Sequence, residues 1–164
     1  MVKSLYRGPA NGDTCAAGRP GYGPALWQRG LRILVAELDA RYLEGIRLFN
    51  EHEFFACHDV LEELWSETLG PERSFYQGLI HAAVALHHFE TDNLGGARKM
   101  HESARRYLEP YGPAYLGLDV ERFLDELREC FRELIEAGNV YPAGTVLDAD
   151  RVPRLHHSPT SEAN

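Results

Sequence analysis

Apolar side chains recur at every third or fourth position through most of the chain, which is the period of an α-helix. The first such stretch begins after Pro24 and ends near Asn50, and four more follow it. No stretch shows the alternation of apolar and polar residues that is typical of a half-buried strand. The helices predicted from this pattern cover about residues 25–50, 53–68, 72–90, 94–109 and 120–137.

Residues that start and stop helices stand between these stretches. Gly70-Pro71 separates the second predicted helix from the third, because glycine favours the end of a helix and proline its first turn. Asp119 is a natural N-cap for the fifth helix, and Gly138 follows the end of that helix. Five amphipathic helices joined by short loops predict an all-α fold, a single antiparallel helical bundle.

The bundle is expected to cover residues 25–138, with an irregular, disordered arm on each side. Residues 1–24 contain five glycines and three prolines with almost no aliphatic periodicity, so we expect a flexible arm there. Residues 139–164 are rich in Pro, Asp, Ser and Thr and predict an irregular tail, in which the His156-His157 pair is solvated. Four apolar residues of this tail are placed to dock locally on the bundle: Val140, Tyr141, Val146 and Leu147.

Composition and charge narrow the class of protein. The chain has 164 residues, 44% of them hydrophobic and 26% charged, which fits one domain. A formal net charge of −8 without a basic stripe argues against a nucleic acid as partner. We find no apolar run long enough to span a membrane and no signal peptide, so we expect a cytoplasmic protein without membrane contact. Cys15, Cys57 and Cys130 are far apart and are expected to be free thiols.

Ionisable residues border the apolar face of the second predicted helix. At about 100° per residue, His58 and Glu62 lie about 40° apart, at the edge of that face. Glu63 points about 140° away from His58, toward solvent or toward another neighbour. The two adjacent glutamates are therefore expected to have different roles.

A line of polar residues runs along the third predicted helix, which is otherwise apolar around most of its circumference. Unpartnered buried polar groups cost roughly 1–3 kcal/mol each, so this line must face another polar surface or a water-filled pocket. Consecutive helices joined by a tight turn pack antiparallel, and we expect the line to meet His58 and Glu62. Its members, which all fall within about 40° of one line along the helix, are Arg73, Gln77, His81 and His88.

Three interpretations of this polar cluster remain open. It is a structural network in which Glu62 pairs with Arg73 or a histidine, and the protein is then a non-catalytic helical module that binds a protein partner. Alternatively, it binds or hydrolyses a small polar or anionic molecule, with His58 as base or ligand, Glu62 as its carboxylate partner and Arg73 as an anion clamp. In the third interpretation, His58, Glu62 and His81 hold a divalent metal such as Zn²⁺ or Fe²⁺.

Several short motifs of this region occur in the order typical of a known family. They are Leu48-Phe49-Asn50, the pattern HxxxEExW from His58 to Trp65, Gly70-Pro71, Arg73, the run from Phe75 to His81, and the run from Asn93 to Ala97. Over about residues 42–136 the chain resembles an uncharacterised, mainly prokaryotic family of all-α bundles, catalogued as a domain of unknown function. The resemblance implies no activity.

The resemblance also implies which positions belong to a shared site. We take His58 and Glu62 as the candidate catalytic pair on this basis and on their spacing. The candidate ligand-binding residues are Glu63, Trp65, Arg73, Gln77 and Asn93, together with His81 where many members of the family have Gln.

Overall fold

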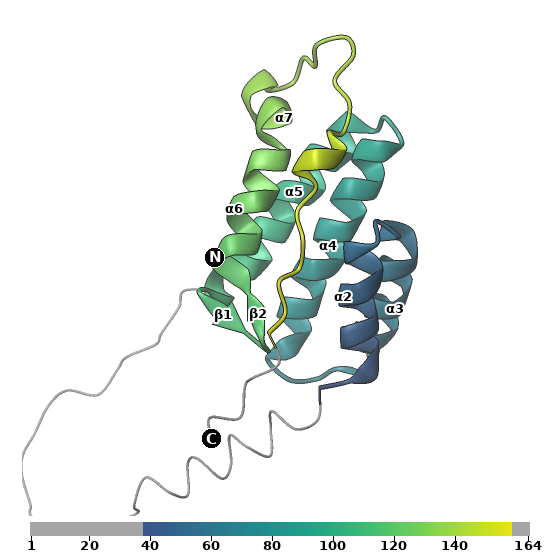
Figure 1. Ribbon diagram of the computed structural model, residues 1–164, viewed down its shortest axis with the longest axis vertical. Coiled ribbons are helices and arrows are strands. Elements are labelled where there is room, and N and C mark those ends of the chain that lie inside the picture. Colours follow the sequence, from purple (N-terminus) through teal and green to yellow (C-terminus); the bar gives the residue numbers. More distant parts are fainter. Residues whose placement is uncertain (1–37, 159–164) are drawn as a thin grey trace, which may run out of the picture.

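The computed structural model describes residues 38–158, which form a bundle of helices (Figure 1). The all-α prediction is confirmed for this part of the chain. The arm predicted for residues 1–24 and the helical stretch predicted for residues 25–37 lie outside the described residues. The α-helices are α2 (Ala40–Asn50), α3 (Phe54–Glu67), α4 (Glu72–Glu90), α5 (Leu94–Leu108), α6 (Val120–Cys130) and α7 (Arg132–Ala137).

Helix α4 lies in the centre of the bundle and packs against α3 and α5 (Figure 1). Its bounds, Glu72–Glu90, are those predicted from the apolar pattern. Phe75, Leu79 and Leu86 are fully buried on its inner face. Because each buried side chain of this size contributes about 1.5–3 kcal/mol, this face holds the neighbouring helices in place.

Close approach between helices depends on a glycine at two crossings. A Cβ atom on Gly78 of α4 would lie 2.6 Å from Cγ of Leu108 on α5, which is too close for any larger residue. A Cβ atom on Gly45 of α2 would likewise lie 2.6 Å from Cδ2 of Leu61 on α3. The leucine side chains therefore fill the space that the two glycines leave open.

The fifth predicted helix is interrupted once, so that it forms α6 and α7. The break is at Phe131, which has φ −93° and ψ 4° and is fully buried against Phe89 and His101. The turn directs this aromatic ring into the core. Both ends of the combined segment are as predicted, because Asp119 caps α6 by accepting a hydrogen bond from the Arg122 N–H and Gly138 ends α7.

A short β-hairpin follows α5 and the 3₁₀ turn η1 (Glu109–Tyr111). It consists of β1 (Ala114–Tyr115) and β2 (Leu118–Asp119), paired antiparallel with Tyr115 opposite Leu118. The two residues between the strands, Leu116 and Gly117, both have positive φ, as the tightest hairpin turns require. Strands of two residues are too short to show alternation, so the apolar pattern could not predict them.

The C-terminal tail is irregular apart from the 3₁₀ turn η2 (Ala149–Arg151), but over residues 139–158 it packs on the bundle. In Figure 1 it runs down the bundle between α6 and α2. Leu155 is its main anchor, with 2% of its surface exposed, and the Asn50 side chain binds both the N–H and the C=O of Leu155. The expectation of a disordered tail is therefore wrong for these residues, because specific backbone contacts order them.

The apolar residues predicted to dock this tail divide into two groups. Tyr141 and Leu147 pack against the core, whereas Val140 and Val146 are 82% and 72% exposed. Most of the anchoring comes instead from residues nearer the end of the described tail. The end of the described tail is therefore held by residues, Leu155 above all, that the apolar pattern did not predict to be buried.

The described residues also bear on two features that define classes of protein, membrane-spanning helices and reactive cysteines. None of the helices within residues 38–158 combines the length and the apolar content needed to cross a membrane. Cys57 and Cys130 are buried free thiols, and burial raises the pKa of each to about 12. Both cysteines are therefore core residues with unreactive thiols.

Candidate functional site

Two contacts fix how α3 and α4 lie beside each other. The Arg73 guanidinium near the start of α4 lies 3.8 Å from the Trp65 ring centroid near the end of α3. Near the opposite ends, the ring centroids of Phe55 and His87 are 5.5 Å apart. The two helices are therefore antiparallel, as predicted, and the polar residues between these contacts lie along one helix pair.

Arg73 closes the end of α3. Its Nη1 donates hydrogen bonds to the carbonyl oxygens of Trp65 at 2.8 Å and Thr68 at 2.9 Å, while its guanidinium stacks over the indole ring. Carbonyls in the last turn of a helix lack intrahelical partners, and a guanidinium satisfies them while also making a cation–π contact. The structure thus gives Arg73 partners in its own chain.

His58 and Glu62 come together as the spacing predicted. Nε2 of His58 lies 3.3 Å from Oε2 of Glu62, and Nδ1 lies 3.0 Å from Oδ1 of the neighbouring Asp59. The imidazole is 26% exposed and the two carboxylate side chains more than half exposed, so this group lies at the surface. Glu63 is exposed as well, and its carbonyl accepts a hydrogen bond from the Ser66 hydroxyl.

His81 is directed away from α3 and toward α5. Its Nδ1 shares a 2.9 Å hydrogen bond with the Ser103 hydroxyl, and its ring packs edge-on against Tyr107 at 5.3 Å. Burial lowers the pKa of His81, and the charge of Arg106 lowers it further. Gln77, one turn before His81 on α4, is half-buried. The polar line on α4 therefore serves two neighbouring helices rather than one.

Asn93 acts as a helix cap. Its Oδ1 accepts a hydrogen bond from the Gly96 N–H at 3.1 Å, at the start of α5, and its Nδ2 lies 3.3 Å from Nδ1 of His88. This satisfies one of the free N–H groups at the helix N-terminus. The position predicted for ligand binding thus has a structural partner.

The proposed metal ligands are not gathered. Within residues 38–158 no group of three or more His, Cys, Asp or Glu side chains is placed to hold a metal ion. Of the three residues considered, His58 and Glu62 are adjacent, whereas His81 binds Ser103 on the other side of α4. The zinc or iron interpretation gains no support from this arrangement.

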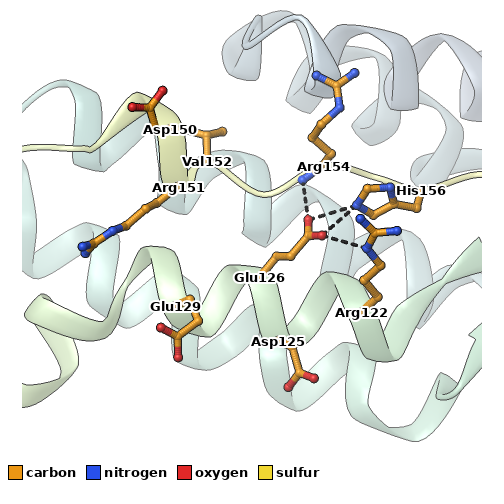
Figure 2. Close-up of a pocket in the computed structure, with 9 residues that line it drawn as sticks. All are labelled: Arg122, Asp125, Glu126, Glu129, Asp150, Arg151, Val152, Arg154 and His156. Atoms are coloured by element: carbon orange, nitrogen blue, oxygen red, sulfur yellow. Dashed lines mark hydrogen bonds and ion pairs between the residues drawn. The ribbon is translucent and has the colours of Figure 1, made fainter.

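A cavity of about 470 Å³ lies between α6 and the tail (Figure 2). Glu126 on α6 is its central residue and accepts hydrogen bonds from the Arg122 side chain and the Arg154 N–H, with Nε2 of His156 at 2.8 Å. Burial by itself would raise the pKa of Glu126, but these donors outweigh it and hold that pKa below its usual value. His156 is therefore a bound residue, which corrects the expectation of a solvated pair.

A second cavity, of about 730 Å³, has His101 of α5 in its wall. His101 is only 3% exposed and stacks on Phe131 at 4.8 Å. Its Nδ1 has no hydrogen-bond partner among residues 38–158. Burial lowers the pKa of His101 to about 4, and the charge of Arg105 adds to the effect. His101 lies on the same face of α5 as the buried Ala97, Ala104 and Leu108, at steps of four, three and four residues, so its spacing agrees with its burial.

The fold and these contacts define a small all-α protein in which α3, α4 and the N-cap of α5 carry the predicted site residues. Residues 42–100 match a family model described as "Domain of unknown function (DUF309)". The resemblance to a family of unknown function is thereby confirmed, over a shorter range than residues 42–136. The match includes most of α2, all of α3 and α4, and the first part of α5.

Two curated proteins are similar to parts of this chain. The chain is 37% identical over 92 residues to "Uncharacterized protein YpuF" of Bacillus subtilis (strain 168), an alignment that covers 54% of this chain and 52% of that protein. It is 38% identical over 64 residues to an "Uncharacterized protein" of Aquifex aeolicus (strain VF5), covering 38% of this chain and 19% of that protein. The chain thus spans about half of the first relative and a fifth of the second.

Proposed function

We propose that this protein is a non-catalytic interaction module, and that the outer face of α3 binds a basic segment of a partner protein. The observation that carries this proposal is Phe55, which is 60% exposed on that face. Phe55 follows one line along the helix with Asp59, Glu62 and Ser66, at steps of four, three and four residues. We call these four residues the α3 face.

The charge of α3 sets it apart from its neighbours. The helix contains no Lys or Arg, and His58 contacts Asp59 and Glu62. By contrast, α2, α5 and α6 carry arginine–carboxylate pairs along their own surfaces. An exposed aromatic ring beside two carboxylates that lie against an imidazole rather than against Lys or Arg suits a partner with basic side chains around an apolar pocket.

The partners of the other predicted residues support a structural role for them. Arg73 binds backbone carbonyls, His81 binds Ser103 and Asn93 caps α5. Both ring nitrogens of His58 lie near carboxylates of its own helix, those of Asp59 and Glu62. This arrangement favours the structural-network interpretation over hydrolysis.

The proposal is tested by fluorescence anisotropy with a labelled helical peptide of Lys and Leu, and with its Glu and Leu counterpart. Glu62→Lys and Phe55→Ser should each weaken binding of the basic peptide by at least about tenfold, because they remove the central contacts of the face. The matched control is Glu136→Lys, which makes the same charge change at an exposed position on α7. If the control loses as much affinity as Glu62→Lys, the attraction is a property of net charge and the proposal is overturned.

Small-molecule binding at His58 and Glu62 is the second candidate, and the 3.3 Å approach of these side chains favours it. Here a polar or anionic metabolite would contact His58, with Arg73 and Gln77 farther along the same helix pair. A thermal-shift screen with a metabolite panel distinguishes the candidates. Stabilisation that His58→Ala abolishes and Phe55→Ser preserves would support the small molecule, since that ligand would not need the aromatic ring.

We also propose that the protein acts in the cytoplasm. The two described cysteines, Cys57 and Cys130, are both free, which is usual where thiols are kept reduced. Fractionation of the producing cells, followed by detection with an antibody, tests this proposal. Recovery in a membrane or secreted fraction would contradict it.

A further inference from the structure

The bundle contacts the backbone of the tail directly. We call residues 152–158 the tail segment and the surface that holds it the tail groove. On α2, the Asn50 amide donates to the carbonyl of Leu155 at 3.0 Å and accepts from its N–H at 2.8 Å. On α6, Glu126 accepts from the Arg154 N–H at 3.0 Å (Figure 2). Contacts of this type recognise an extended peptide through its main chain.

The hairpin adds further main-chain contacts. The Asp119 N–H donates to the carbonyl of His156 at 3.1 Å, and the Ser158 N–H donates to the carbonyl of Gly117 at 2.9 Å. Between these bonds, Leu118 and His157 form an antiparallel bridge. The tail segment is thus seated as an added strand at the edge of β2, which is a common mode of peptide recognition.

Side chains give the tail groove its selectivity. Leu155 is 2% exposed and Pro153 is buried, so two apolar residues anchor the tail segment. His156 places its Nε2 2.8 Å from the Glu126 carboxylate. An extended peptide needs a leucine followed by a histidine to reproduce these contacts.

The connection that joins the tail segment to the bundle, residues 139–151, is partly exposed. Val140 and Val146, within it, are 82% and 72% exposed. The cavity of about 470 Å³ lies where the tail meets α6, beside the groove. At roughly 3.3 Å per residue, the connection from 139 to 151 could extend to about 40 Å. That reach is enough to place the tail segment on a neighbouring molecule.

We propose that the tail groove is a peptide-recognition site, and that its occupant in trans is the tail segment of a second copy of this chain. The reason is complementarity: the tail segment already supplies the main-chain geometry, the buried leucine and the histidine that the groove accepts. Exchange of an identical segment between copies requires no new contact, because each groove keeps the same partner sequence. The two grooves would be filled reciprocally in a dimer.

The covalent connection determines whether the tail segment binds its own groove or the groove of a second copy. A segment attached to its own groove has an effective concentration on the order of millimolar, so dilute protein favours the intramolecular state. Weakening the contacts between the tail segment and its own groove should allow the groove to bind a peptide that is added in solution. This prediction can be tested on the full chain.

The first experiment measures fluorescence anisotropy of a labelled peptide with the sequence of residues 149–158. Full-length Leu155→Ala should bind this peptide at least about tenfold more tightly than the wild-type chain, because its own tail no longer competes well. The double variant Asn50→Ala/Leu155→Ala should lose that gain, and a scrambled peptide should not bind. Equal binding of the scrambled peptide, or no saturable binding to Leu155→Ala, would overturn the proposal.

A second tail variant guards against a folding defect. If Leu155→Ala does not fold, His156→Ala replaces it, because this variant removes the contact of the tail segment with Glu126 and leaves the buried leucine in place. The same changes in peptide binding are then expected. Exchange between copies is then measured by sedimentation of the wild-type chain at increasing concentration. A dimer whose fraction falls when excess peptide is added supports the proposal. A strictly monomeric chain, or a dimer that the peptide does not affect, would overturn the second copy as occupant.

Discussion

His101 should make the stability of this protein depend on pH. The imidazole is 3% exposed and stacks on Phe131, and within the described part of the chain its Nδ1 lacks a partner. On α5, Arg105 lies near enough to oppose its protonation, and Glu102 only partly offsets that effect. The folded protein therefore keeps His101 neutral at pH values where the unfolded chain binds a proton.

The magnitude follows from the two pKa values. Burial lowers the pKa of His101 from 6.5 to about 4 in the folded state. Because the unfolded chain takes up this proton first, stability falls as the pH falls from about 6.5 to about 4 and changes little beyond that range. Between pH 7 and pH 5 the loss from this one residue is about 2 kcal/mol.

The assay is urea unfolding followed by circular dichroism, at pH 7 and pH 5, for the wild-type chain and for His101→Phe. Phenylalanine keeps the stack on Phe131, has no unpartnered nitrogen and can extend toward the adjoining cavity. The variant should be at least as stable as the wild type at pH 7 and should lose about 2 kcal/mol less on acidification. His81 and His157 also have pKa values lowered by burial, so only the difference between the two proteins isolates His101. If both proteins lose the same free energy, the reasoning is refuted.

Three further substitutions test individual contacts by urea or thermal unfolding. Arg73→Lys should cost about 1–2 kcal/mol, since an ammonium cannot both stack flat on Trp65 and reach two carbonyls; an unchanged midpoint would contradict this. Gly78→Ala should cost about 1–3 kcal/mol because its Cβ would meet Leu108, and a stabilised protein would show that α4 and α5 can separate freely. Asn50→Ala should cost about 1–2 kcal/mol and speed hydrogen exchange in the tail, whereas unchanged exchange would show that the amide does not hold it.

The helices could be predicted because their buried faces repeat with a single period. On α4, the apolar residues from Phe75 to Phe89 face one core, and the predicted bounds agree with the structure. Caps added local information, since Asp119 accepts a hydrogen bond from the main chain wherever its helix lies in the fold. The break at Phe131 had no such signal, because the helical period continues through it.

The partners of the polar residues could not be predicted in the same way. Periodicity gives the angle of a side chain on its own helix but not which neighbour lies at that angle. His81 and Arg73 share one line on α4, yet the first binds α5 and the second closes α3. Within one helix the spacing sufficed, and His58 does approach Glu62.

The tail shows the limit of local patterns most clearly. Asn50 and Leu155 are 105 positions apart, and nothing in either neighbourhood indicates the other. A single leucine between polar residues has no periodicity to reveal that it is buried. Its burial depends on a surface that exists only after the helices have packed.

One consequence of the docked tail concerns the connectivity of the chain. The rings of Tyr42, in the first turn of α2, and His157 are 6.1 Å apart, so the beginning and the end of the described region meet. A short linker could therefore join position 158 to position 38, with new ends opened in the exposed stretch around Val146. Such a circular permutant would keep every helix crossing and would tie the end of the tail segment directly to the start of α2, so that the segment could no longer reach a neighbouring molecule through the connection from 139 to 151.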